Sequence, residues 1–70
     1  MLQAILFDRK KFNKSMVEKY LSEHNHKLLK GKKLHYTEKY IRARIAEPNK
    51  NMDKFIKKTN VTGVKYIIQV

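Results

Sequence analysis

Apolar and polar positions along the chain follow a strand-like pattern in three places. Leu2 to Phe7 is a short apolar run of β-prone residues, which is typical of a buried strand. From Tyr40 to Ala46 and from Val64 to Val70, apolar side chains alternate with polar ones. A period of two residues is typical of a strand that buries one face. The pattern therefore predicts three strands.

A helical spacing follows the first strand. Asn13 is a good N-cap residue, and Asn25 suits the left-handed position that ends a helix. We expect a helix from Lys14 to His24 whose buried face carries the apolar residues spaced three or four apart. These residues are Met16, Val17, Tyr20 and Leu21.

A second, shorter helix is predicted after Pro48. Asn51 can cap one or two turns in which Met52, Phe55 and Ile56 share a face. Residues 1–70 are therefore expected to form a single α+β domain, with one helix packed on a small, mainly antiparallel three-stranded sheet. The strands over 40–46 and 64–70 are expected to be neighbours, and the place of the first strand is left open.

The composition indicates a strongly basic protein that binds an anionic partner. The 70 residues include 17 Lys or Arg and 6 Asp or Glu, which gives a net charge of +11, and 41% of the chain is apolar. Such a chain can bury one small core, and its positive potential attracts polyanions. It has no cysteine, which excludes disulfides and thiolate metal sites. No apolar stretch is long enough to span a membrane, and Met1 to Phe7 lacks the features of a secretory signal.

Catalytic and metal-binding patterns are not evident. The chain has no paired carboxylates, no Ser–His–Asp arrangement and no Gly-rich phosphate loop. Of the three histidines, His24 and His26 are expected to diverge at the helix end, and His35 stands apart. We therefore expect a protein that is not an enzyme and uses neither a metal nor a cofactor.

The strand over 40–46 carries the strongest candidate for binding chemistry. Arg42 and Arg44 would lie on one face about 7 Å apart, close to the spacing of phosphates along a nucleic-acid strand. Tyr40 on the same face could stack on a base or cover an Arg, and Lys65 could join them from the neighbouring strand. The alternative is an ordinary solvated face in which the arginines pair with Glu38 and Glu47.

Lysine clusters extend this candidate site. Lysines outnumber arginines by 14 to 3, and lysine is a flexible point charge suited to phosphate contact without base reading. AT-rich coding explains part of this lysine count, but not the shortage of acidic residues. The lysines expected to contact phosphates are Lys30, Lys32, Lys33, Lys57 and Lys58.

The motifs also resemble a small domain found in proteins of tailed bacteriophages and large DNA viruses, sometimes appended to head-maturation proteases. The resemblance covers nearly the whole chain and rests on the joint order of several short motifs. In this chain they are Phe12-Asn13, Tyr20-Leu21, His24-Asn25, Tyr40-Ile41-Arg42-Ala43-Arg44 with Pro48, Phe55, and Gly63-Val64-Lys65-Tyr66-Ile67-Ile68.

Three positions depart from the pattern of that domain. Ala43 replaces an aromatic residue, Ile45 a glutamine, and Ile56 an arginine that often follows the Phe. Any contact made by that glutamine or arginine does not carry over to this chain. The resemblance implies a viral setting and supports a role for the Arg pair, because a merely solvated face would also accept Lys or Thr.

Two classes of function follow from these features. The first is a viral accessory protein that binds nucleic acid, DNA more than RNA, without strong sequence preference, inside the infected cell and in genome packaging. The second is a virion docking module whose Arg strand, or whose edge strand over 64–70, contacts acidic capsid or protease partners. A weaker third option is inhibition of a host enzyme by competition for its nucleic-acid substrate. No membrane partner is expected, and the oligomeric state is left open.

Overall fold

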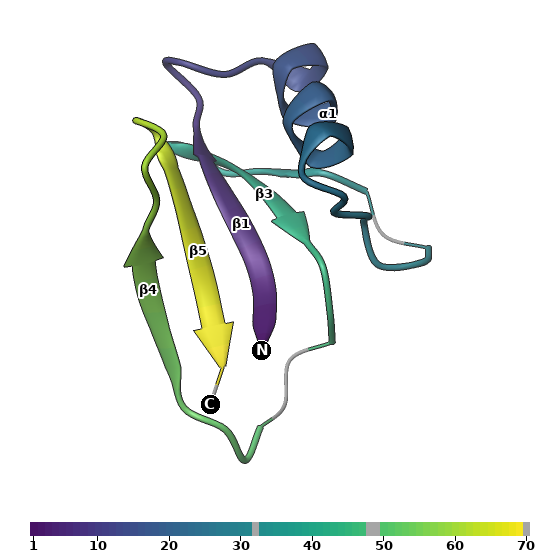
Figure 1. The fold of residues 1–70 in the computed structure, drawn as a ribbon, viewed down its shortest axis with the longest axis vertical. Coiled ribbons are helices and arrows are strands. Elements are labelled where there is room, and N and C mark those ends of the chain that lie inside the picture. Colours follow the sequence, from purple (N-terminus) through teal and green to yellow (C-terminus); the bar gives the residue numbers. More distant parts are fainter. Residues whose placement is uncertain (32, 48–49, 70) are drawn as a thin grey trace.

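The computed structural model describes residues 1–31, 33–47 and 50–69, and it shows one helix lying on a five-stranded antiparallel sheet (Figure 1). The strand order is β2-β3-β1-β5-β4. In chain order, the elements are β1 (Leu2–Asp8), α1 (Lys14–Glu23), β2 (His35–Tyr36), β3 (Tyr40–Arg44), β4 (Lys54–Lys58) and β5 (Val64–Gln69).

The prediction of a three-stranded sheet is wrong, because β2 and β4 were not foreseen. The segment expected to form a short helix is instead β4, which pairs with β5 from Lys54 opposite Gln69 to Lys58 opposite Lys65. An isolated helix of one or two turns is marginal in water. Pairing as a strand satisfies backbone groups of both β4 and β5, so tertiary pairing overrides the local helical spacing.

The expected pairing of the second and third predicted strands is also wrong. β1 lies between them and pairs with β3 on one side and with β5 on the other. Ala4, Ile5 and Phe7 of β1 are fully buried although they point to alternating faces of the strand. A strand that is apolar on both faces fits the centre of the sheet, where β3 and β5 flank it along both edges.

The bounds predicted for the helix are confirmed to within one residue. Met16, which was expected on its buried face, is instead 45% exposed. The Asn13 side chain accepts a hydrogen bond from the Met16 backbone N–H at 2.9 Å, and α1 ends at Glu23, with His24 as the C-cap residue. Asn25 adopts the expected left-handed conformation, with φ of 57°. The strand predicted over 40–46 ends earlier, at Arg44, and Val70 of the last predicted strand lies outside the described residues.

We expect Asn13→Ala to lower the free energy of unfolding by about 1 kcal/mol, because it leaves the Met16 N–H without its capping acceptor. Urea denaturation followed by circular dichroism measures the change. Asn13→Ser keeps a capping oxygen and is expected to unfold at nearly the wild-type midpoint. A loss of the same size in both variants would contradict the capping role of Asn13.

The core lies between α1 and one face of the sheet. Pairing places Phe7 of β1 between Ile41 of β3 and Val64 of β5, all on that face. The ring of Phe7 lies 5.3 Å from that of Tyr20 and 5.2 Å from that of Phe12, measured between centroids. The buried core residues are Ile5, Phe7, Val17, Leu21, Ile41, Ala43 and Val64.

The other face of the sheet is called the open face below. No helix of the described residues lies on it, since α1 is the single helix and packs on the core side. Because paired residues share a face, the register fixes which side chains point there. The residues of the open face with charged or aromatic side chains are Asp8, His35, Tyr40, Arg42, Arg44, Lys54, Lys58 and Lys65.

Candidate nucleic-acid interface

Arg42 and Arg44 lie on the open face, on the opposite side of β1 from Lys65. Leu6 of β1 pairs with Arg42 of β3 on one side and with Lys65 of β5 on the other. The prediction that Lys65 comes from the strand next to the Arg pair is therefore wrong. Lys65 lies two strands away, about 10 Å across the sheet. The centre of the face is thus a strip formed by Ala4 and Leu6, which ends at Asp8, with cationic side chains along both sides.

The outer strand β4 adds two more cations to this face. Lys58 pairs with Lys65, and Lys54 pairs with Gln69, so both lysines point to the open face. Lys58 was among the predicted contact residues and Lys54 was not, because a segment expected to be helical gives no alternating pattern. Cations from β3, β5 and β4 therefore share one surface that spans about 14 Å across the strands.

Tyr40 holds Lys65 in place on the open face. The Lys65 ammonium lies 5.5 Å from the centroid of the Tyr40 ring and donates a hydrogen bond of 3.2 Å to the Tyr40 hydroxyl. The ring is half-buried and already has a cation over it, a favourable arrangement for an aromatic face. The sequence suggested that Tyr40 could stack on a base. Its geometry instead favours a role in positioning Lys65.

The arginines have no acidic partner in the described part of the chain. The alternative pairing with Glu38 and Glu47 is not observed, and the one ion pair found there joins Lys19 to Glu23 at 3.8 Å. The Arg42 Nε atom is buried and has no hydrogen-bond acceptor among the described residues. Burial, and then the charge of Arg44, lower the pKa of Arg42 below its ordinary value. An anion bound between the two guanidinium groups would relieve this repulsion.

A hollow of about 310 Å³ opens beside the Arg pair. Its walls come from β3, from the short strand β2 and from the segments that flank β2. Lys33 was a predicted contact residue, whereas His35 and Thr37 were missed, because a strand of two residues is too short to show a periodicity. The residues that line the hollow are Lys33, His35, Thr37, Arg42 and Arg44.

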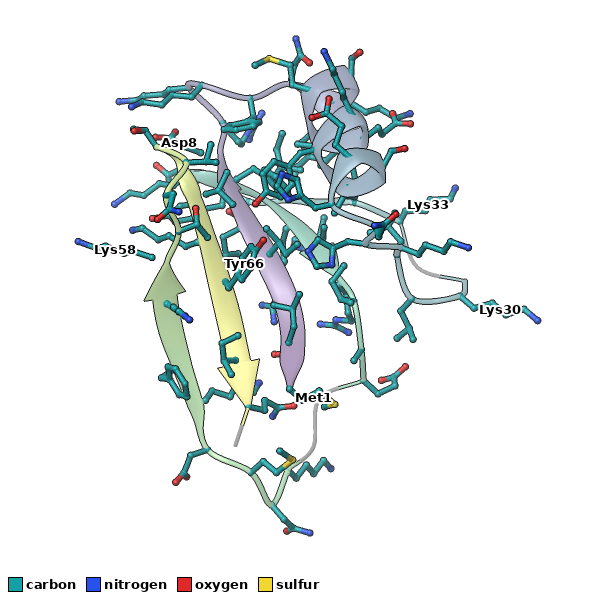
Figure 2. All side chains as sticks on the ribbon, viewed as in Figure 1. Met1, Asp8, Lys30, Lys33, Lys58 and Tyr66 are labelled. Atoms are coloured by element: carbon teal, nitrogen blue, oxygen red, sulfur yellow. The ribbon has the colours of Figure 1, made fainter. Side chains whose placement is uncertain are left out.

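The other predicted lysines do not join this surface. Lys57 pairs with Tyr66, so it points to the core side of the sheet rather than to the open face. Lys30 is exposed in the segment after α1, and Figure 2 shows it at the opposite margin of the molecule from Lys58. Lys32 lies outside the described residues.

His24 and His26 belong to a cluster of rings rather than diverging as expected. Their rings lie 6.4 Å apart and nearly parallel, at an angle of 12°. Tyr20 stacks on His24 with its centroid at 4.1 Å, and its hydroxyl lies 2.9 Å from that of Tyr66. Burial and this hydrogen bond raise the pKa of Tyr20. Across residues 1–31, 33–47 and 50–69, no three His, Cys, Asp or Glu side chains form a metal-binding group.

No helix of the described residues is long and apolar enough to cross a membrane. Comparisons of the chain with protein-family models, with curated proteins and with solved structures found no match.

Proposed function

We propose that the protein binds nucleic acid through the open face, without strong sequence preference. The observation that carries this proposal is the gathering of cations from β3, β5 and β4 on a face without a helix, where the Arg pair has no carboxylate partner in the described part of the chain. Phosphate groups are the anions that such a surface of arginine and lysine side chains suits best. The proposal requires no catalytic group and no cofactor.

Sequence independence follows from the shape and chemistry of the surface. Base reading in a duplex requires a helix or a β-ribbon that enters a groove, and the open face is a sheet surface with short side chains at its centre. Its charged ends are mostly lysines, which contact phosphates without fixed geometry. The face therefore fits a backbone laid across the strands.

The biological setting that we propose is a viral one. It rests on the resemblance of the motifs to the domain of tailed-phage and large DNA virus proteins. In that setting the protein would act inside the infected cell, neutralising phosphates of the viral genome during packaging, with DNA favoured over RNA.

Binding through phosphates predicts a strong dependence on salt. We expect the logarithm of the association constant to fall linearly with the logarithm of the salt concentration, by about 0.9 per contacted phosphate on duplex DNA and about 0.7 on single strands. With four or five cations in contact, the duplex slope should be near −4. Fluorescence anisotropy with labelled single- and double-stranded oligonucleotides in a salt series measures it. Binding that hardly responds to salt would contradict the proposal.

A second candidate function is docking to an acidic protein, and the outer edge of β4 favours it. No strand of the described residues pairs with that edge, and Phe55 and Ile56 on it are 46% and 60% exposed. An extended acidic segment could add there as a further strand. The expected edge strand over 64–70 is not available for this, because β5 is paired on both sides. A partner held by strand pairing would bind with little salt dependence, which separates the two candidates.

A further inference from the structure

The hollow at the β2 margin of the open face differs from the rest of that face. Elsewhere the cations are spread over separate strands, but here basic side chains converge on one concave volume of about 310 Å³. We infer that this hollow binds a phosphomonoester dianion, the terminal phosphate of a nucleic-acid strand. The inference rests on the proposed function and adds the end of the strand as a specific ligand.

The hydrogen-bond donors around the hollow are largely free to bind such a group. In the described part of the chain, no hydrogen bond or ion pair engages the charged ends of Lys33 and Arg44. The guanidinium of Arg42 adds N–H donors at its end, whereas its Nε atom is buried and has no acceptor among the described residues. Thr37 is different, because its hydroxyl donates to the carbonyl of Tyr40 and accepts from the backbone N–H of Tyr40. Thr37 therefore shapes the hollow, and the basic residues supply the donors.

The charge of the hollow selects a dianion. Lys33, Arg42 and Arg44 carry three full positive charges, His35 adds a ring N–H donor, and no carboxylate of the described residues lines the hollow. A phosphodiester carries one negative charge, whereas a terminal phosphate carries between one and a half and two at neutral pH and offers three acceptor oxygens. A terminal phosphate therefore matches both the charge and the number of donors better than an internal phosphate does.

The position of the hollow fits a strand that ends there. It lies between β3 and the short outer strand β2, whereas Lys65, Lys58 and Lys54 lie on the opposite side of β1. A strand whose terminal phosphate occupied the hollow would run across the sheet toward β4. Its internal phosphates would then meet the more widely spaced cations of β5 and β4.

Single-stranded oligonucleotides of one sequence, with a 5′-phosphate, a 3′-phosphate or hydroxyls at both ends, test this inference by anisotropy at 0.15 M salt. We expect at least one phosphorylated form to bind about fourfold more tightly than the hydroxyl form, which is about the effect of one more phosphate contact on a single strand. Lys33→Ala/His35→Ala should remove this preference, so that the variant binds the phosphorylated and hydroxyl forms equally. The matched control Lys54→Ala/Lys58→Ala should weaken all forms and keep the preference.

The possible results separate this inference from the proposed function. Equal binding of all forms by the wild-type protein would overturn the terminal-phosphate site and leave nucleic-acid binding intact. Failure of every form to bind would overturn the proposed function itself. A nucleoside monophosphate that binds as tightly as the phosphorylated oligonucleotide would place a free nucleotide in the hollow and overturn the assignment to a strand end.

Discussion

Phe7→Ala is expected to leave most of the protein molecules unfolded at 25 °C. Phe7 is fully buried at the centre of the sheet, where its ring contacts those of Phe12 and Tyr20. Truncation of a buried Phe to Ala costs about 3–5 kcal/mol. A single small core of this size supplies a net stability of about the same magnitude. The loss is therefore comparable to the whole free energy of unfolding.

Urea denaturation and circular dichroism measure this effect, and Phe55→Ala is the matched control. Phe55 lies on the outer strand β4 and is 46% exposed, so its truncation leaves no cavity in the core and is expected to cost less than about 1 kcal/mol. The expected result is a loss of helical and sheet signal for Phe7→Ala alone. Equal unfolding midpoints for the two variants would contradict the assignment of the core.

The elements that the sequence predicts correctly are those with complete local signals. The helix has a capping residue at Asn13, an apolar face and a left-handed terminator at Asn25, and it forms where expected. The alternation around Arg42 and Arg44 likewise forms a strand. In each case the residue pattern that predicts the element lies within a few residues along the chain.

The missed elements form by pairing with the strand that follows them in the chain, and their own residue pattern does not reveal that pairing. β4 forms because β5 offers a paired edge, and β2 forms because the chain turns back at Thr37 and Tyr40 onto β3. No local pattern distinguishes Phe55 and Ile56 on a strand from the same residues on a helical turn. One signal for the strand order was usable, since Leu2–Phe7 is mostly apolar and the strand that it forms, β1, lies between β3 and β5.

The residues of the candidate site likewise divide into those that a local pattern predicts and those that depend on strand pairing. A period of two residues places Tyr40, Arg42 and Arg44 on one face, and the register of the sheet puts them there. The contribution of Lys54 and His35 depends on strands that were not predicted. The approach of Lys65 to Tyr40 crosses β1, so it could not be foreseen without the strand order.

Arg42→Ala/Arg44→Ala is expected to weaken binding to a duplex oligonucleotide about 30-fold at 0.15 M salt. Each phosphate contact contributes about a fivefold factor at this salt concentration relative to 1 M, so the loss of two contacts multiplies to that value. The slope of the salt dependence should also become shallower by about 1.8. The fold should persist, because both side chains lie on the open face and neither belongs to the core.

The matched control removes two charges from the helix side of the molecule. Lys14 at the start of α1 and Lys27 just after it are both exposed, and neither lies on the open face. Lys14→Ala/Lys27→Ala therefore has the same net charge as the arginine variant but changes only the long-range potential. Salt screens that potential over about 8 Å at 0.15 M, so the expected loss of affinity is less than about threefold.

The most direct test is the affinity of these two double variants and the wild-type protein for one labelled oligonucleotide at 0.15 M salt, with circular dichroism to show that all three are folded. Binding through the open face predicts that the arginine variant loses at least about ten times more affinity than the lysine variant. Equal losses in the two folded variants would contradict a defined binding face and leave only the net charge of the protein as the source of attraction.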